Sequence, residues 1–355
     1  MIRRTSRRAL VGAGPGEGCR RWAVPVSDGA MPLKEQVEHA RSRTTLAEHA
    51  GKSGAALEQV VLTDGRRLVV KRFSPRDDLL MASRGEQVGS EYVAWSTGLL
   101  DRLPSSVGHP VVGAWVEDDT TVVVMRDLGD EVLTWEHRLD RSRLRWMLRR
   151  VADLHLAFLD RPVEGLTPLT DHLALFSPAR MRAHVDEGNP LAAATVRGWE
   201  LFGEQVPHDV AAAVAGLLDD PGPLAEALLR RPSTLLHGDL ATVNMAFEGD
   251  RLVLIDWAMV VYGPGAVDVA RFVAGCSQVV DASREEILAE YADALGPAHD
   301  EQAMRLALLA GLVWLGWNKA LDAALHPDPD KRHRERADLA WWVSRARAAL
   351  DAGLL

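Results

Sequence analysis

The sequence predicts an α+β fold with two lobes, a small antiparallel sheet followed by a mainly helical region. Short strand-like runs separated by turn residues fill most of residues 44–128. After Leu128, apolar residues recur mostly at helical spacing, and only residues 235–257 interrupt that pattern with strand-like runs. The 355 residues, 47% hydrophobic and 26% charged, suit an ordinary globular protein with at least one sizeable core.

Composition narrows the class of partner. The net charge of -9 argues against nucleic acid, which needs a basic surface, and fits a cationic or neutral small molecule better. Cys19 and Cys276 are the only cysteines, too few for a disulfide framework. The apolar run from Leu306 to Trp317 is shorter than the roughly 20 residues of a membrane span. We therefore expect a cytoplasmic monomer or homodimer with no nucleic-acid or membrane partner.

The first residues contain patterns that resemble known signals without completing them. RRTSRRAL lacks the apolar stretch of an export signal, and VGAGPGEG has Glu17 where a dinucleotide loop needs its third glycine. We interpret residues 1–35 as a flexible N-terminal extension. The shift from strand-like to helical patterns then divides the chain into an N-lobe, residues 36–128, and a C-lobe, residues 129–355.

The N-lobe pattern predicts four strands and one helix. ALEQVVL and RLVVKRF flank Asp64-Gly65, a strong hairpin signal. Residues 86–100 have helical spacing, and VVGAWV and TVVVMRDLG follow as strands. The GKS of residues 50–55 suggests a P-loop, but Leu46 occupies the first glycine position and a strand follows instead of a helix. A glycine-bearing turn between antiparallel strands is the better interpretation.

The C-lobe pattern predicts several buried helices. Apolar residues at helical spacing occur in five segments: 144–159, 211–218, 284–295, the run from Leu306, and 337–350. Trp314, Trp317, Trp341 and Trp342 lie within such apolar runs, so we assign them to the core rather than to an aromatic cage for a cation. His155, on an otherwise apolar helix, is expected to be a hydrogen-bonded core histidine.

The segment LLHGDLATVNMAFEGDRLVLIDW, residues 235–257, has the most specific pattern. MAF and RLVLI should pair as an antiparallel hairpin. Asn244 precedes the first strand and Asp256 follows the second, so pairing brings both to the open end of the hairpin. An amide oxygen and a carboxylate placed together suit magnesium. Asp239, on the approaching loop, can then face the reacting group.

These motifs carry a family resemblance. HGDLATVN, then LIDW, then GPGAVDVARF resemble the aminoglycoside phosphotransferase and choline kinase family, which has a protein-kinase-like fold. In that family HGDxxxxN stands where protein kinases have HRDxxxxN, and IDW or IDF stands where they have DFG. The resemblance covers about residues 40–320 and implies a two-lobed kinase-like fold.

The resemblance implies roles for individual residues of the C-lobe. Asp239 would accept or orient the proton of the substrate hydroxyl, and Asn244 and Asp256 would hold magnesium. His237 would brace the catalytic loop, and Asp268 would fix its backbone.

The same comparison implies a nucleotide site in the N-lobe. Lys71 at the end of LVVK would contact the phosphates, with Glu91 as its partner and Glu86 as the less favoured one. Backbone groups from Met125 to Leu128, Asp127 among them, would hold adenine. Ser53 and Gly54 would lie over the phosphates, although their loop departs from the GxGxxG of protein kinases.

The implied activity is ATP- (or GTP-) and magnesium-dependent phosphorylation of a hydroxyl group on a small-molecule acceptor. An antibiotic, aminoglycoside-like or another natural product, is the favoured acceptor, so the role would be resistance by inactivation. A metabolic kinase for an amino alcohol, sugar or nucleoside fits the same motifs. A catalytically idle nucleotide-binding module is the third alternative, which the complete set of Lys71, Asp239, Asn244 and Asp256 disfavours.

Overall fold

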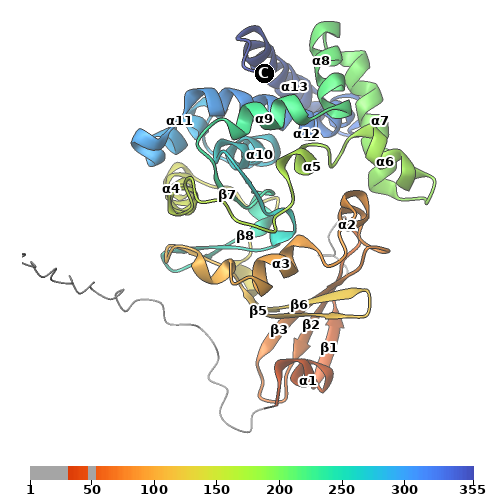
Figure 1. Cartoon of the computed structure of the whole chain (residues 1–355), viewed down its shortest axis with the longest axis vertical. Coiled ribbons are helices and arrows are strands. Elements are labelled where there is room, and N and C mark those ends of the chain that lie inside the picture. Colours follow the sequence, from red (N-terminus) through yellow and green to blue (C-terminus); the bar gives the residue numbers. More distant parts are fainter. Residues whose placement is uncertain (1–30, 47–52) are drawn as a thin grey trace, which may run out of the picture.

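The computed structural model describes residues 31–46 and 53–355, and their fold has two parts (Figure 1). A five-stranded antiparallel sheet lies at one end, and a mainly helical part lies at the other. The predicted α+β fold is therefore confirmed. The strands of the sheet, in spatial order, are β1 (Ser42–Thr45), β2 (Ala56–Val61), β3 (Arg67–Phe73), β6 (Thr120–Arg126) and β5 (Val111–Glu117).

The two faces of this sheet have different partners because side chains alternate along a strand. In β3, Leu68 and Val70 belong to a small outer cluster with Val37 of α1 (Leu33–Glu38). Lys71 is two positions from Val69 and Phe73, so it points to the inner face, toward the helical part. The β2–β3 hairpin turns at the expected Asp64-Gly65, where the N–H of Leu62 donates to the carbonyl of Arg66.

Two helices, instead of the one predicted, cover the inner face. The helix predicted for residues 86–100 is too long. The observed helix α3 spans only Ser90–Ser96, and a short 3-10 turn follows at Leu100–Arg102. The second helix, α2 (Leu79–Arg84), was missed although its ends carry clear signals. Asp78 caps the first turn by accepting two backbone N–H groups, and Gly85 ends the helix in the left-handed conformation.

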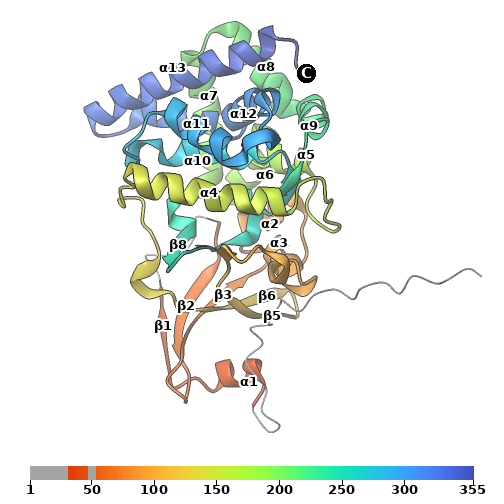
Figure 2. The ribbon, with the colours of Figure 1, turned by 90° about the vertical axis from the view of Figure 1, so that its left-hand side faces the viewer.

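The helical part contains ten α-helices in the described sequence, layered above the sheet (Figures 1 and 2). All five segments predicted to be helical fall on helices, and Trp314, Trp317 and Trp342 are buried. Five other helices, α5, α6, α7, α9 and α10, were not predicted. The helices are α4 (Arg141–Ala157), α5 (Leu169–Leu173), α6 (Pro178–Val185), α7 (Pro190–Gln205), α8 (His208–Asp219), α9 (Gly222–Leu229), α10 (Ala266–Cys276), α11 (Arg284–Leu295), α12 (Glu301–Leu325) and α13 (Pro329–Asp351).

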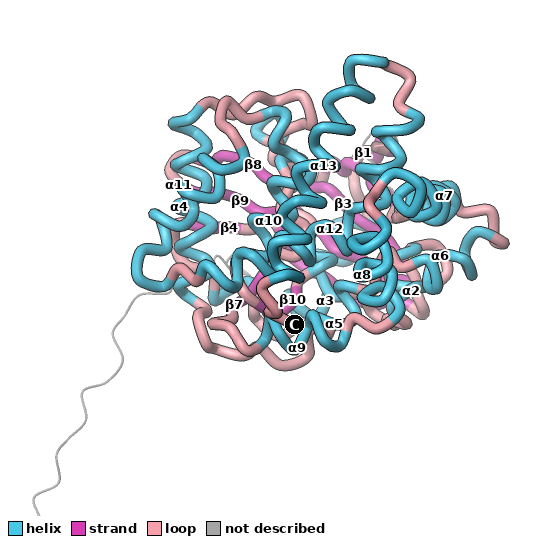
Figure 3. Tube along the Cα trace, turned by 90° about the horizontal axis from the view of Figure 1, so that it is seen from above, coloured by secondary structure: helices cyan, strands magenta, loops and turns pink. Residues whose placement is uncertain are grey.

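Short strands connect the two parts. The hairpin of β8 (Met245–Glu248) and β9 (Arg251–Leu254) has the predicted antiparallel pairing. β9 also pairs in parallel with β4 (Val107–Gly108), which belongs to the N-terminal half. β7 (Thr234–Leu236) pairs with β10 (Val261–Gly263) and leads into the HGD sequence. Seen from above, these strands lie beneath the helical layer (Figure 3).

The proposed lobe boundaries can be located on this fold. The boundary at 35/36 falls within α1, and residues 1–30 lie outside the described residues. The boundary at 128/129 follows the last strand of the five-stranded sheet. Residues 47–52, which include part of the GKS segment, also lie outside the described residues, and the strands on either side, β1 and β2, pair antiparallel. In the ranges that the structure describes, no helix combines the length and apolar character needed to cross a bilayer.

A buried ion cluster joins the last helices. Lys319 of α12 and Arg284 of α11 both pair with Asp338 of α13, and the Lys319 and Asp338 side chains are 7% and 6% exposed. Most of the segment 330–338 at the start of α13 is exposed, but Asp338 is an exception because its charge is neutralised inside the helix layer.

Asp338→Ala should destabilise the fold strongly, because it leaves the buried Lys319 ammonium with only the more distant carboxylate of Glu335, at 3.6 Å. Removing one partner of a buried ion pair typically costs about 3–5 kcal/mol. Urea unfolding followed by circular dichroism measures the change. Arg145→Ala is the control, since its pair with Glu290 lies at the surface and should leave the midpoint unchanged. Equal stability of the Asp338 variant and the wild type would contradict this account.

Candidate active site

Lys71 joins three elements of the fold. Its Nζ lies 2.8 Å from Oε2 of Glu91 on α3 and 2.8 Å from Oδ1 of Asp256, which follows β9. The Lys71 side chain is 10% exposed and that of Glu91 is fully buried. Burial alone would lower the pKa of Lys71, but the charges of Asp256 and Glu91 outweigh it and raise the pKa above its usual value. Lys71 is therefore a fixed cation between the two lobes.

The structure separates the two candidate partners of Lys71. Glu86 does not contact it. The Glu86 carboxylate pairs with Arg84 at 3.0 Å and accepts hydrogen bonds from Ser90 and Thr167. Glu86 thus connects the start of α3 to the helical part, whereas Glu91, five residues further and within α3, faces Lys71 of the sheet.

The HGD turn requires glycine at its centre. Gly238 has φ of +83°, and a Cβ built there would lie 1.8 Å from the carbonyl oxygen of Met259. Close packing against the segment after Asp256 therefore excludes any side chain at this position. His237 crosses the same contact, with its Nε2 2.9 Å from the carbonyl oxygen of Ile255. The loop bearing Asp239 and the segment bearing Asp256 are held against each other.

Asp268, at the start of α10, anchors this turn from beneath. Its two carboxylate oxygens accept the backbone N–H groups of His237 and Gly238, each at 2.8 Å. Burial favours a raised pKa for Asp268, but hydrogen bonding and the nearby histidine side chains outweigh it and keep the pKa below the usual value. The buried carboxylate therefore stays ionised and holds two loop amides.

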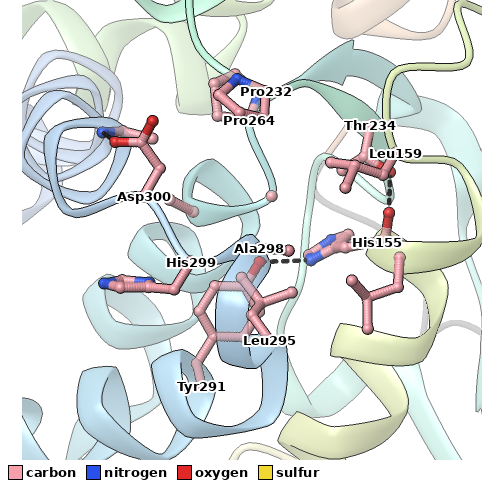
Figure 4. Close-up of a pocket in the computed structure, with 14 residues that line it drawn as sticks. His155, Leu159, Pro232, Thr234, Pro264, Tyr291, Leu295, Ala298, His299 and Asp300 are labelled. Atoms are coloured by element: carbon pink, nitrogen blue, oxygen red, sulfur yellow. Dashed lines mark hydrogen bonds between the residues drawn. The ribbon is translucent and has the colours of Figure 1, made fainter.

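A second histidine supports Asp268. His155 of α4 lies 3.3 Å from Oδ2 of Asp268 through Nε2, and its Nδ1 lies 2.8 Å from the Tyr291 hydroxyl of α11. Figure 4 shows the Tyr291 hydroxyl pointing at His155 beside a cavity of about 30 Å³. His155 is hydrogen-bonded and buried, as expected from the sequence. The chain Tyr291, His155, Asp268 ends at the two backbone amides of the HGD turn.

Asp239 is held on both carboxylate oxygens. Arg271 of α10 donates from Nε to Oδ1 at 2.7 Å, and Asn244 donates from Nδ2 to Oδ2 at 3.0 Å. The same Asn244 nitrogen donates to the backbone carbonyl of Asp239 at 2.9 Å. The side chain of Asp239 is nevertheless 21% exposed, so its remaining lone pairs can reach a ligand.

The hairpin places Asn244 and Asp256 at its open end. Met245 pairs with Leu254, and the N–H of Ile255 donates to the carbonyl of Asn244 at 3.0 Å. Asp256 has φ of +62°, an unusual left-handed conformation for a non-glycine residue. Burial acts to raise its pKa, but the Lys71 charge outweighs this and lowers it, so Asp256 is ionised.

This pair fits a magnesium ion by its chemistry. The Asn244 Nδ2 is committed to Asp239, which leaves its Oδ1 as an acceptor, and only Oδ1 of Asp256 bonds Lys71. Hard oxygen donors of this kind, completed by phosphate oxygens and water, are what magnesium uses. No group of three or more His, Cys, Asp or Glu side chains in the described ranges has the spacing to hold a metal.

The residues suggested for adenine lie at the junction of the lobes. Met125 is the penultimate residue of strand β6 and is buried. The Asp127 carboxylate is occupied by Gln59 and by the N–H of Gly129, at 2.8 and 2.9 Å. Leu128 accepts from the N–H of Glu131 and so begins a 3-10 turn. Their role toward a nucleotide stays a prediction.

Ser53 and Gly54 lie against the start of α2. The Ser53 carbonyl accepts from the N–H of Leu79 at 2.8 Å. Gly54 has φ of +114°, and a Cβ there would lie 1.9 Å from the carbonyl oxygen of Asp77. No contact joins them to Lys71 among the described residues. Their position over the phosphates also stays a prediction.

Two supporting residues were missed by the sequence reasoning. Arg271 stands three residues after Asp268 in the AVDVARF motif, one helical turn further on the same face. His155 was assigned to the core without a link to the catalytic loop. The Arg271 signal was readable from helical spacing, whereas the link of His155 to Asp268 depends on packing between α4 and α10.

The phosphotransferase enzyme family (APH) matches residues 49–306. No curated protein sequence matches. Among solved structures, choline kinase LicA from Streptococcus pneumoniae superposes with a TM-score of 0.51 at 14% identity, covering 88% of this chain and 97% of the other.

An aminoglycoside phosphotransferase from Alicyclobacillus acidocaldarius superposes with a TM-score of 0.47 at 15% identity, covering 92% of this chain and 98% of the other. A macrolide 2'-phosphotransferase, MphH from Brachybacterium faecium, gives 0.43 at 18% identity, with 84% and 92% covered. The family match and the kinase-like fold agree with the site described above. The chain belongs to the APH phosphotransferase family and is a small-molecule kinase.

Glu91→Gln should weaken the hold on Lys71 by removing one of its two anionic partners. We expect a higher KM for the nucleotide and a kcat lower by roughly 10-fold or more, because a misplaced cation stabilises the phosphates less. Steady-state kinetics with varied ATP measure both constants. Glu86→Gln is the matched control on the same segment, and it should leave the KM for ATP unchanged. The reverse pattern would make Glu86 the functional partner.

Proposed function

We propose that this protein transfers the γ-phosphate of ATP or GTP, with magnesium, to a hydroxyl group of a small molecule. The observation that carries the proposal is the position of Lys71, bonded at once to Glu91 and to Asp256. Asp256 in turn lies at the hairpin end beside Asn244, whose amide bonds Asp239. One continuous set of contacts thus joins a cation for phosphates, two oxygen donors for a metal, and a carboxylate for a hydroxyl.

In this proposal, Asn244 Oδ1 and Asp256 hold the metal. Magnesium, when bound, would neutralise charge on the phosphate oxygens. Lys71 adds a second positive charge. It belongs to the N-lobe, residues 36–128, and faces the C-lobe, residues 129–355. Ser53, Gly54 and the backbone from Met125 to Leu128 would complete the nucleotide site.

Asp239 acts on the acceptor. The acceptor oxygen forms a bond to the γ-phosphorus as the bond to the β-phosphate oxygen breaks, and Asp239 takes the hydroxyl proton. Phosphoryl transfer of this kind depends mostly on positioning and electrostatics. The contacts of Asp239 with Arg271 and Asn244 support this role, because they fix its orientation. Asp268 and His237 would keep the loop in place.

An antibiotic is the acceptor class we favour, by the resemblance of the HGDLATVN and LIDW motifs to antibiotic kinases, and resistance by inactivation is the corresponding role. The enzyme would act in the cytoplasm as a monomer or homodimer. A metabolic kinase for an amino alcohol, a sugar or a nucleoside is the alternative outcome of the test below.

Purified protein with magnesium and ATP or GTP should phosphorylate at least one compound of a mixed panel. The panel contains aminoglycosides, peptide and nucleoside antibiotics, choline and sugars, and mass spectrometry detects the added phosphate. A product among the antibiotics supports inactivation, and a product only among choline or sugars supports the metabolic alternative. No product together with no nucleotide-induced thermal shift would refute the kinase proposal.

Two variants separate the roles of the site carboxylates. Asp256→Ala should abolish the magnesium-dependent part of nucleotide binding, because it removes a metal ligand. Asp239→Asn keeps the size of the side chain, so nucleotide and magnesium should still bind while turnover falls roughly 10²-fold or more. Calorimetric titration with and without magnesium, alongside turnover, measures both. Loss of magnesium-dependent binding in Asp239→Asn but not in Asp256→Ala would reverse the assignment.

A further inference from the structure

Arg271 occupies a distinctive position next to Asp239. Its side chain is 12% exposed, and its Nε donates to Oδ1 of Asp239 at 2.7 Å. The Cζ atom of its guanidinium lies 5.5 Å from the ring centre of Trp314 on α12, which is itself buried. A guanidinium packed over a buried indole has a fixed plane. The orientation of Arg271 is therefore set by the core, not by solvent.

Only one edge of this guanidinium is used. Neither Nη1 nor Nη2 donates a hydrogen bond to any described residue, although the arginine fork carries four N–H groups there. Gly275, one turn further on α10, leaves the space for them, because a Cβ at that position would lie 2.2 Å from Nη1. Glycine inside a helix costs about 1 kcal/mol relative to alanine, so this space has a structural cost.

Several carboxylates of this region already have partners, and the free Oδ2 of the 43% exposed Asp256 belongs to the carboxylate that we propose for magnesium. Asp239 is paired with Arg271, Glu86 with Arg84, and Asp171 with Arg180. The other two acidic groups near Arg84 and His172 are also bound: Asp78 caps α2 and Asp268 holds the HGD amides. A polycationic ligand needs unpaired carboxylates to replace its hydration.

His172 adds no negative charge to this region. It lies on α5 and is 2% exposed. Its ring stacks on that of Trp314, with the two ring centres 4.9 Å apart. Burial lowers the pKa of His172 to about 4, so the ring is neutral at physiological pH. Its Nδ1 has no hydrogen-bond partner among the described residues. The side chains bonded to Asp239 are thus one cation, Arg271, and one neutral amide, Asn244, and the rings behind Arg271 carry no charge.

We propose that Arg271 positions Asp239 through Nε and binds an acceptor oxygen through its free Nη groups, so that the acceptor carries no ammonium group beside the reacting hydroxyl. The inference rests on the proposed phosphotransfer to a hydroxyl and narrows its substrate class to compounds that are uncharged or acidic at that point. Overall charge had favoured a cationic or neutral substrate, and the Arg271 cation beside Asp239 disfavours the cationic one at that point.

The first test compares Arg271→Met and Arg271→Lys with the wild type on the acceptor found in the panel. Arg271→Met should lower kcat and raise the acceptor KM, with kcat/KM for the acceptor down roughly 10²-fold, while the KM for ATP stays unchanged. Arg271→Lys should recover part of kcat, because its charge can still reach Asp239, but not the acceptor KM, because it lacks the fork. Arg145→Met, remote from the site, is the control for removing an arginine.

A purely structural role would lower the unfolding midpoint and change the KM for ATP and for the acceptor together, and that result would overturn the proposal. If Arg271→Met does not fold, the acceptor KM of Arg271→Lys alone tests the proposal, which predicts that this KM is raised above the wild-type value. If no compound of the panel is phosphorylated but ATP is hydrolysed, the rate of ATP hydrolysis is compared between the variants in place of kcat. A fall in hydrolysis with an unchanged KM for ATP then supports the positioning role, and an unchanged rate contradicts it.

The second test is the charge of the phosphorylated compound. The proposal predicts a product among nucleosides, sugars or other compounds without an ammonium group next to the hydroxyl. A product only from aminoglycosides or choline would leave the phosphotransferase function intact and refute this inference. Absence of transfer to every compound and to water would instead refute the proposed function on which it rests.

Discussion

The contact of Lys71 with Glu91 and Asp256 is the interaction on which the rest of the site depends. It joins β3, α3 and the segment after β9, which come from both halves of the chain. One positive charge faces two negative ones, and although Asp256 is 43% exposed, Glu91 is fully buried, so the cation cannot move without leaving a buried carboxylate unpaired. The relative position of sheet and hairpin is therefore coupled to the electrostatics of the site.

The loop that carries Asp239, which we propose to be catalytic, is fixed by an independent set of contacts. Asp268 holds the two amides before Asp239, and Gly238 packs against Met259 so closely that only glycine fits. Because phosphoryl transfer relies on orientation more than on covalent chemistry, a loop held from its backbone is a suitable support for a base. The side chain of Asp239 is then oriented separately, by Arg271 and Asn244.

Local patterns were enough to predict much of this arrangement. The hairpin around residues 249–250 and the helix that carries Glu91 follow from short-range periodicity, whereas the position of Lys71 was implied by the family resemblance. The choice of Glu91 over Glu86 needs one more fact, the point at which α3 begins. That point depends on Gly89 and on the contacts of Glu86 with the helical part, which short-range spacing does not specify.

Residues that act across helices were harder to predict. His155 reaches Asp268 only because α4 packs beside α10, and Arg180 reaches Asp171 only because α6 lies beside α5. Such pairings decide which charges remain available to a ligand, so the acceptor could not be inferred from composition. The −9 net charge describes the whole surface, whereas Asp239 itself is already paired with Arg271.

The most direct test of the central claim is a crystal structure with manganese and a non-hydrolysable ATP analogue. The account predicts an anomalous manganese peak bonded to Asn244 Oδ1 and to the Asp256 carboxylate. It also predicts Lys71 Nζ on a phosphate oxygen with its Glu91 contact retained. A nucleotide bound elsewhere, or manganese that touches neither Asn244 nor Asp256, would contradict the account.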